Sequence, residues 1–214
     1  MESRVAQAEQ KETGRLEAFS DGVFAIAITL LALNLAIPHL GGNSSNKALG
    51  DALSAQWPSY VAFFTSFFTI LVMWVNHHRV FRLIERTSAQ LMYANGFLLM
   101  MTTAVPFSTG LLSEYFRLPG ARLAAAVYSG TFVLIALGYQ LVWMSLLRNR
   151  SLFKRSVPET EIATITKNYR MGVPIYLLAT IAAFFSVYAS VGICTALWVF
   201  WAATSQDCVD FTAR

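Results

Sequence analysis

Charge is scarce in this sequence, and its scarcity excludes an ordinary soluble domain. Asp, Glu, Lys and Arg make up 13% of the 214 residues, whereas hydrophobic residues make up 56% and the mean hydropathy is +0.51. Soluble domains carry about 25% charged residues. Several uncharged runs approach the roughly 20 residues that a helix needs to cross the hydrocarbon core, and the alternation typical of barrel strands is absent. The sequence therefore predicts an all-α integral membrane protein.

Cysteine and histidine are scarce as well, which excludes a disulfide framework and argues against a metal site. Cys194 and Cys208 are the two cysteines, and their positions match no metal-ligand spacing. His77 and His78 are adjacent, so on a helix they do not form the one-face pair found at a four-residue spacing. The few acids of the loops form no nucleophile and base pair. We therefore expect no cofactor, no resident metal and no enzymatic activity.

Six apolar segments are predicted to span the membrane. Only the short sequence from Tyr188 to Gly192 separates the last two, so an interpretation with four or five spans remains open. The predicted organisation is a cytoplasmic leader (1–16), a six-helix transmembrane domain (17–206) and a cytoplasmic tail (207–214). The six segments cover about residues 17–37, 56–76, 89–112, 121–147, 171–188 and 191–206.

The basic residues predict the orientation of these segments, because Lys and Arg accumulate on the cytoplasmic side of membrane proteins. They concentrate in the leader, between segments two and three, and between segments four and five, whereas the opposite side carries only Lys47, Arg117 and Arg122. We expect a multi-pass protein of the inner (plasma) membrane with both termini in the cytoplasm, which requires an even number of spans. Because these cations flank apolar segments, they do not indicate nucleic-acid binding.

Polar residues collect at the predicted cytoplasmic ends of the first three segments. Polar groups at the edge of the hydrocarbon tend to be partnered, functional or both. Ser20 and Asp21 are equally compatible with a simple helix cap, and His77 with a pH-sensing role. The candidate cluster, which lies at one depth and ties three helices together, comprises Arg15, Ser20, Asp21, Trp74, His77 and Asn95.

The first segment carries a stripe of bulky residues beside a stripe of small ones. At 3.6 residues per turn, Gly22, Ile26, Thr29 or Leu30, and Leu33 share one face. Alanines line the neighbouring face, and small residues permit close contact between helices in lipid. The pattern favours a centrally packed first helix, although an ordinary buried helix fits the periodicity equally well.

Two motifs resemble those of a known channel family. Arg15-x3-Phe19-Ser20-Asp21 opens the first segment, and Trp74-x2-His77-His78 closes the second. Together they resemble the bacterial relatives of the lysosomal potassium channel known as transmembrane protein 175. The resemblance implies a potassium-permeable homotetramer in the lipid bilayer, in which four first helices surround the pore, since the Phe-Ser-Asp motif occurs once in this chain.

The resemblance also implies roles for the candidate residues. It places the pore constriction at Ile26, with further layers at Thr29 or Leu30 and at Leu33, and an inner polar network at Arg15, Ser20, Asp21 and His77, to which Trp74 and Asn95 are added by proximity. Neither a Thr-Val-Gly-Tyr-Gly filter nor a series of arginines within a span is present. The predicted function is a potassium-permeable cation channel with a hydrophobic constriction and no voltage sensor.

Two alternatives remain open at this stage. Pro106 and Pro174 interrupt apolar segments, as prolines do in the discontinuous helices of secondary transporters. Protons are a second alternative cargo for the same pathway, because His77 and Asp21 lie near its predicted inner entrance.

Overall fold

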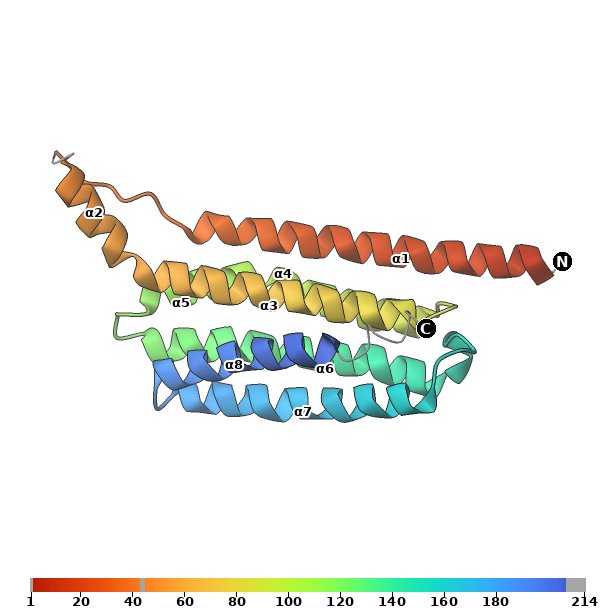
Figure 1. Ribbon diagram of the computed structural model, residues 1–214. Helices are drawn as coiled ribbons and strands as arrows, with labels where there is room; N and C mark the ends of the chain where they lie inside the picture. Colours follow the sequence, from red (N-terminus) through yellow and green to blue (C-terminus); the bar gives the residue numbers. More distant parts are fainter. Residues whose placement is uncertain (1, 43–44, 207–214) are drawn as a thin grey trace.

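The computed structural model describes residues 2–42 and 45–206, and within them the chain is helical throughout apart from short connections (Figure 1). The predicted tail (207–214) and Cys208 lie outside the described residues. The α-helices are α1 (Glu2–Leu30), α2 (Asn46–Ala55), α3 (Trp57–Arg82), α4 (Ala89–Thr103), α5 (Val105–Tyr115), α6 (Ala121–Arg148), α7 (Glu159–Ala183) and α8 (Val187–Gln206), and the 3-10 turns are η1 (Leu31–Asn34) and η2 (Arg150–Leu152).

Five of these helical segments are long and apolar enough to cross a membrane. They are Glu12–Asn34, Trp57–Arg82, Ala89–Tyr115, Ala121–Arg148 and Val187–Thr204. The remaining long helix, α7, has 25 residues, but its first half carries the charged residues Glu159, Glu161, Lys167 and Arg170. The structure therefore confirms a multi-pass helical membrane protein, and the sixth span stays a prediction.

Two helices extend beyond the predicted spans: α1 begins at Glu2 and includes the polar leader, and α7 begins at Glu159. The predicted division of the last two segments at Tyr188 to Gly192 is wrong, because α7 and α8 are separated at residues 184–186. Ser186 provides the physical reason, since its hydroxyl accepts a hydrogen bond from the Ala189 amide at 3.3 Å and so caps the start of α8.

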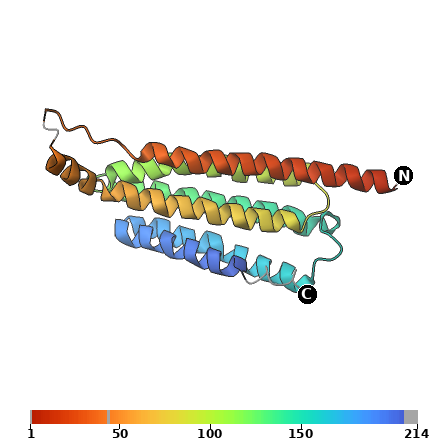
Figure 2. The same cartoon turned by 45° about the horizontal axis from the view of Figure 1, so that its top comes forward.

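The helices form a bundle in which α6 is central and α1 lies at one edge. α6 contacts α4, α5, α7 and α8, whereas α1 packs on α3, α4 and α5. Figures 1 and 2 show α1 along one side of the bundle and α7 and α8 along the other. At the crossing of α4 and α6, Gly138 permits a close approach, because an added Cβ there would lie 2.9 Å from the Cα of Leu98.

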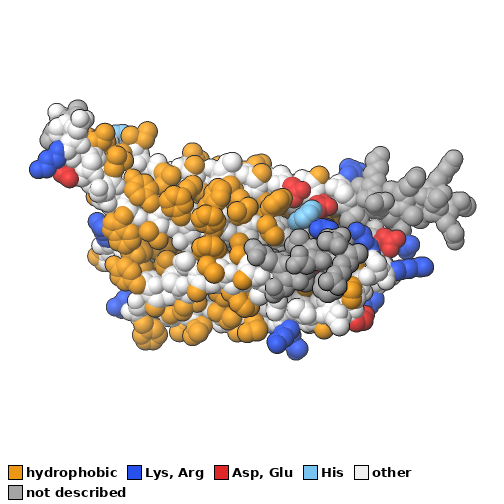
Figure 3. Space-filling model, viewed as in Figure 1, with side chains coloured by type: hydrophobic (Ala, Val, Ile, Leu, Met, Phe, Trp, Pro, Cys, Tyr) orange, Lys and Arg blue, Asp and Glu red, His pale blue; other side chains and the backbone are white. Residues whose placement is uncertain are grey.

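The surface of this bundle has an apolar middle and charged ends. In the view of Figure 3, hydrophobic side chains cover the central part of the molecule, and most charged side chains lie toward its two ends. Arg79 and Arg82 end α3, and Arg148 ends α6. This banding is the distribution expected of a protein whose middle faces hydrocarbon.

The interruption at Pro106 separates α4 from α5 and is held by the end of α1. Pro106 lies in the first turn of α5, where the missing amide proton costs nothing. The Asn34 Nδ2 in η1 donates to the Pro106 carbonyl at 2.9 Å, and a Cβ on Gly110 would lie 2.6 Å from the Asn34 Oδ1. The break therefore serves as a docking point for the first helix.

Candidate functional site

α1 has one face packed on the bundle and one face without a partner in the chain. Ser20, Phe24, Ala27 and Leu31 follow a helical spacing and are buried against neighbouring helices. On the opposite side, Ile26 is 59% exposed and Leu33 is 78% exposed. A single chain thus leaves a continuous apolar strip of its first helix uncovered.

All the residues predicted to line the pore lie on this uncovered strip. Ile26, Thr29, Leu30 and Leu33 are all exposed. The Thr29 hydroxyl donates to the Ile26 carbonyl at 2.9 Å. Because its proton is used within the helix, the lone pairs of the Thr29 oxygen are left to face whatever occupies the strip.

Before the strip, toward the N-terminus of α1, three buried polar side chains join α1, α4 and α3. The Asn95 Nδ2 donates to the Ser20 Oγ at 2.9 Å, and the Asn95 Oδ1 lies 2.9 Å from the His77 Nε2. Ser20, Asn95 and His77 are each almost completely inaccessible to solvent. The structure thus brings together three residues that the sequence analysis placed at one depth.

The order of donors in this series of hydrogen bonds shows which ring nitrogen of His77 carries the proton. The Ser20 hydroxyl donates to the Leu16 carbonyl at 2.8 Å, so it accepts from Asn95, which turns the amide oxygen of Asn95 toward His77. An amide oxygen only accepts, so His77 carries its proton on Nε2. The ring stacks on Phe81 at 4.2 Å between centroids and contacts Phe24 at 5.3 Å, while Nδ1 has no hydrogen-bond partner among the described residues.

A second, outer layer of contacts joins α1 to α3. The Trp74 Nε1 donates to the Asp21 Oδ1 at 2.8 Å, and the His78 Nδ1 lies 2.7 Å from the Glu17 Oε1. Arg15 is exposed and contributes no contact to either layer within the described part of the chain. Five of the six predicted network residues therefore meet within one chain, and Arg15 does not join them.

Sequence reasoning missed Glu17 and Asn34, and it named His78 without assigning it a contact. The contact between Glu17 and His78 had a signal in the sequence, because Glu17 and Asp21 are four residues apart on α1, as are Trp74 and His78 on α3. Residues four apart lie on one face of a helix, and two antiparallel helices pair such positions in opposite order, as observed. Asn34 had no such signal, because its partner is a backbone carbonyl distant in the sequence.

No group of three or more metal-binding side chains occurs among the described residues. Cys194 is buried and free.

Comparisons with known proteins match the region that contains this site. Residues 15–106 match the family described as "Endosomal/lysosomal potassium channel TMEM175". A potassium channel of Chamaesiphon minutus is 48% identical over 202 residues, covering 94% of this chain and 99% of the relative. A potassium channel of Streptomyces collinus is 45% identical over 176 residues, covering 82% and 84%.

More distant relatives and a solved structure agree with these matches. The human endosomal/lysosomal proton channel TMEM175 is 31% identical over 143 residues, which cover 64% of this chain and 28% of the human protein. The crystal structure of a lysosomal potassium-selective channel TMEM175 homolog from Chamaesiphon minutus superposes with a TM-score of 0.81 at 48% identity, covering 92% of this chain and 99% of that one.

Proposed function

Because the chain belongs to the TMEM175 family of potassium channels, we propose that it conducts potassium ions across a membrane along the uncovered face of α1. Four copies would place four such faces around one axis, as the resemblance to the bacterial relatives implies. The observation that carries the proposal is the division of α1 into a packed face and an exposed apolar strip that contains Ile26 and Leu33. The protein is a channel and not an enzyme.

The strip has the properties of a gated ion pathway. Four Ile26 side chains would form a hydrophobic ring, and such rings control conduction by excluding water. One turn further along, four Thr29 hydroxyls would present oxygen lone pairs, because each donates its proton to its own helix. Leu30 and Leu33 would form the layers beyond. No carbonyl filter is required for a pathway of this kind.

The two polar layers would set the tilt of α1 relative to the axis. The inner layer of Ser20, Asn95 and His77 is buried and spans three helices. The outer layer of Asp21 with Trp74, and Glu17 with His78, links α1 to α3 at the surface. A small rotation of α1 would break both layers, so the width of the ring at Ile26 is coupled to their integrity.

The topology that fits this function has six spans in the inner (plasma) membrane, with α7 as the fifth. α7 packs along α6 and α8, and its charged first half lies at the end of the bundle where α3 and α6 end with Arg79, Arg82 and Arg148 (Figure 1). Both termini would then lie in the cytoplasm.

The test is potassium flux into liposomes, followed with a voltage-sensitive dye under a potassium gradient. Ile26→Asn is expected to raise the flux several-fold and to weaken the preference for potassium over sodium, because an amide wets the ring. Ile181→Asn is the matched control, since Ile181 is 56% exposed on α7, far from α1. Equal fluxes for the wild type and the Ile26 variant would contradict the proposal.

Proton conduction along the same pathway is a second candidate, favoured by the names of the vertebrate relatives, which are called proton channels. Reversal potentials measured under separate pH and potassium gradients distinguish the two ions. A reversal potential that follows the pH gradient alone would assign the pathway to protons.

A further inference from the structure

A groove of about 620 Å³ lies between the end of α6 and the first half of α7, on the opposite side of the bundle from α1. Its cations are Arg150, Lys167 and Arg170, and Glu159 is the one acid among the described residues that line it. Leu147 and Met171 add apolar surface. The groove therefore combines an excess of positive charge with hydrocarbon side chains.

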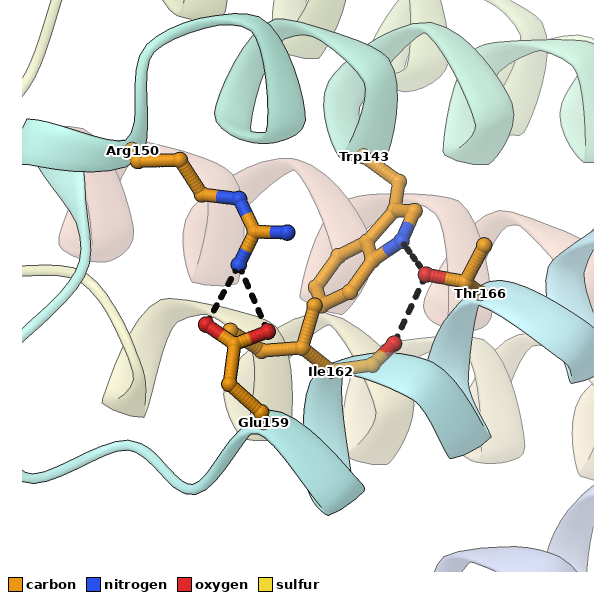
Figure 4. Close-up of polar contacts among 5 residues, drawn as sticks. All are labelled: Trp143, Arg150, Glu159, Ile162 and Thr166. Atoms are coloured by element: carbon orange, nitrogen blue, oxygen red, sulfur yellow. Dashed lines mark hydrogen bonds and ion pairs between the residues drawn. The ribbon is translucent and has the colours of Figure 1, made fainter.

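Hydrogen bonds hold the residues around the groove (Figure 4). The buried Trp143 on α6 donates from Nε1 to the Thr166 Oγ1 on α7 at 2.8 Å, and the Thr166 hydroxyl donates to the Ile162 carbonyl at 2.7 Å. The first of these bonds joins α6 to α7 at Thr166, a residue that lines the groove, and the second lies within α7.

The groove lies where charged surface gives way to apolar surface along α7. Lys167 and Arg170 are exposed, and Met171, which follows immediately, is exposed as well. Further along the helix the exposed residues are apolar, namely Leu177, Leu178 and Ile181. A molecule in the groove thus meets cations at one end and the membrane interior at the other.

We propose that this groove binds the headgroup of an anionic phospholipid, a site distinct from the ion pathway. Lys167 and Arg170 bind the phosphate, and the acyl chains follow Met171 and the exposed apolar residues of α7. Basic pockets between membrane helices recognise acidic headgroups in this way. The apolar continuation favours a lipid over a soluble phosphate, which gains nothing from Met171.

Glu159 limits the affinity of the site. Its two carboxylate oxygens accept hydrogen bonds from one Arg150 nitrogen at 2.8 and 3.0 Å (Figure 4). The contact keeps the Arg150 guanidinium beside the groove but partly neutralised. Removing the charge of Glu159 should therefore strengthen lipid binding, whereas removing a groove cation should weaken it.

Native mass spectrometry of the purified protein, titrated with phosphatidylglycerol or phosphatidylcholine, tests the assignment. Lys167→Gln with Arg170→Gln should weaken phosphatidylglycerol binding roughly 30-fold, since each basic residue near an anionic surface contributes about a factor of five. Glu159→Gln should tighten it several-fold. Lys154→Gln with Arg155→Gln is the matched control, because these exposed residues at the same end line the neighbouring cleft and not this groove.

Three results would overturn the proposal: equal losses in both double variants, equal binding of phosphatidylcholine, or displacement of the lipid by sn-glycerol 3-phosphate at a comparable concentration. The Glu159→Gln variant keeps every cation, so its gain in affinity tests the site even if the double variant at Lys167 and Arg170 fails to fold. Potassium flux is not the readout, and failure of this proposal leaves the proposed function untouched.

Discussion

At the scale of single residues, Asn95 is the side chain on which the inner polar layer depends. It donates to Ser20 on α1 and accepts from His77 on α3, so one amide satisfies groups on two other helices. A buried polar group that loses its partner keeps the cost of its desolvation. Replacing Asn95 therefore affects more than the two hydrogen bonds themselves.

We expect Asn95→Leu to lower the stability of the protein by about 1 kcal/mol or more, because hydrogen bonds between membrane helices contribute roughly 0.6 kcal/mol each. The variant removes the donor to the Ser20 oxygen and leaves the His77 Nε2 without its partner. Thermal unfolding in detergent, followed by circular dichroism, measures the loss.

Asn76→Leu is the control for this prediction, since among the described residues Asn76 donates only to the Val72 carbonyl of its own helix, at 2.9 Å. A melting temperature of Asn95→Leu equal to or above that of Asn76→Leu would show that the inner layer does not stabilise the bundle.

At the scale of elements, the contact between η1 and α5 decides how the far end of α1 is held. Asn34 reaches the Pro106 carbonyl, and Gly110 leaves the space that its side chain occupies. The helix break at Pro106, which by sequence alone also suggested a transporter, is thereby explained as part of the scaffold that positions α1.

Gly110→Ala is expected to destabilise the protein by about 1 kcal/mol, the usual net value of one hydrogen bond, because the new Cβ displaces Asn34. The same substitution in an Asn34→Ala background should be nearly neutral, since the obstructing side chain is gone. A double-mutant cycle measured by chemical unfolding gives the coupling.

Gly130→Ala serves as the control, because a Cβ at position 130 meets no other atom within 4 Å. Additive effects of Gly110→Ala and Asn34→Ala would show that the two residues do not interact.

At the scale of the whole molecule, the exposed strip of α1 has to be covered by something other than this chain. Exposed apolar residues also occur on α7 and α8, where lipid covers them without difficulty. The strip on α1 differs in carrying Ile26, Thr29, Leu30 and Leu33, where the family resemblance places the constriction, directly after the polar layers that join α1 to α3 and α4.

A cysteine placed on the strip tests the assembly. If four first helices surround one axis, Leu33→Cys places the thiols of neighbouring copies on faces that point toward that axis, and a disulfide forms when their Cα atoms approach within about 7 Å. We therefore expect oxidation to yield covalent dimers in a Cys208→Ser background, on a denaturing gel.

Leu178→Cys on α7 is the matched control, because it is exposed on the far side of the bundle. Dimers from Leu178→Cys but not from Leu33→Cys would place α1 at the periphery and remove the basis of the pore.

The sequence by itself determined the class of the protein and the depth of its polar residues. A helix needs about 20 consecutive apolar residues to cross the hydrocarbon core. This requirement concerns one segment at a time, so the spans at about 17–37, 56–76 and 121–147 could each be recognised without knowledge of the others. The polar ends of three segments placed Ser20, His77 and Asn95 at one level for the same reason.

Only the tertiary structure decided which of these residues meet, and which face of α1 stays uncovered. The contacts of Asn95 with Ser20 and His77, of Glu17 with His78, and of Asn34 with Pro106 depend on how the helices are rotated about their axes. In lipid, apolar faces of similar hydrophobicity do not fix that rotation. Close packing at small residues and the pairing of buried polar groups fix it, and both are properties of the assembled bundle.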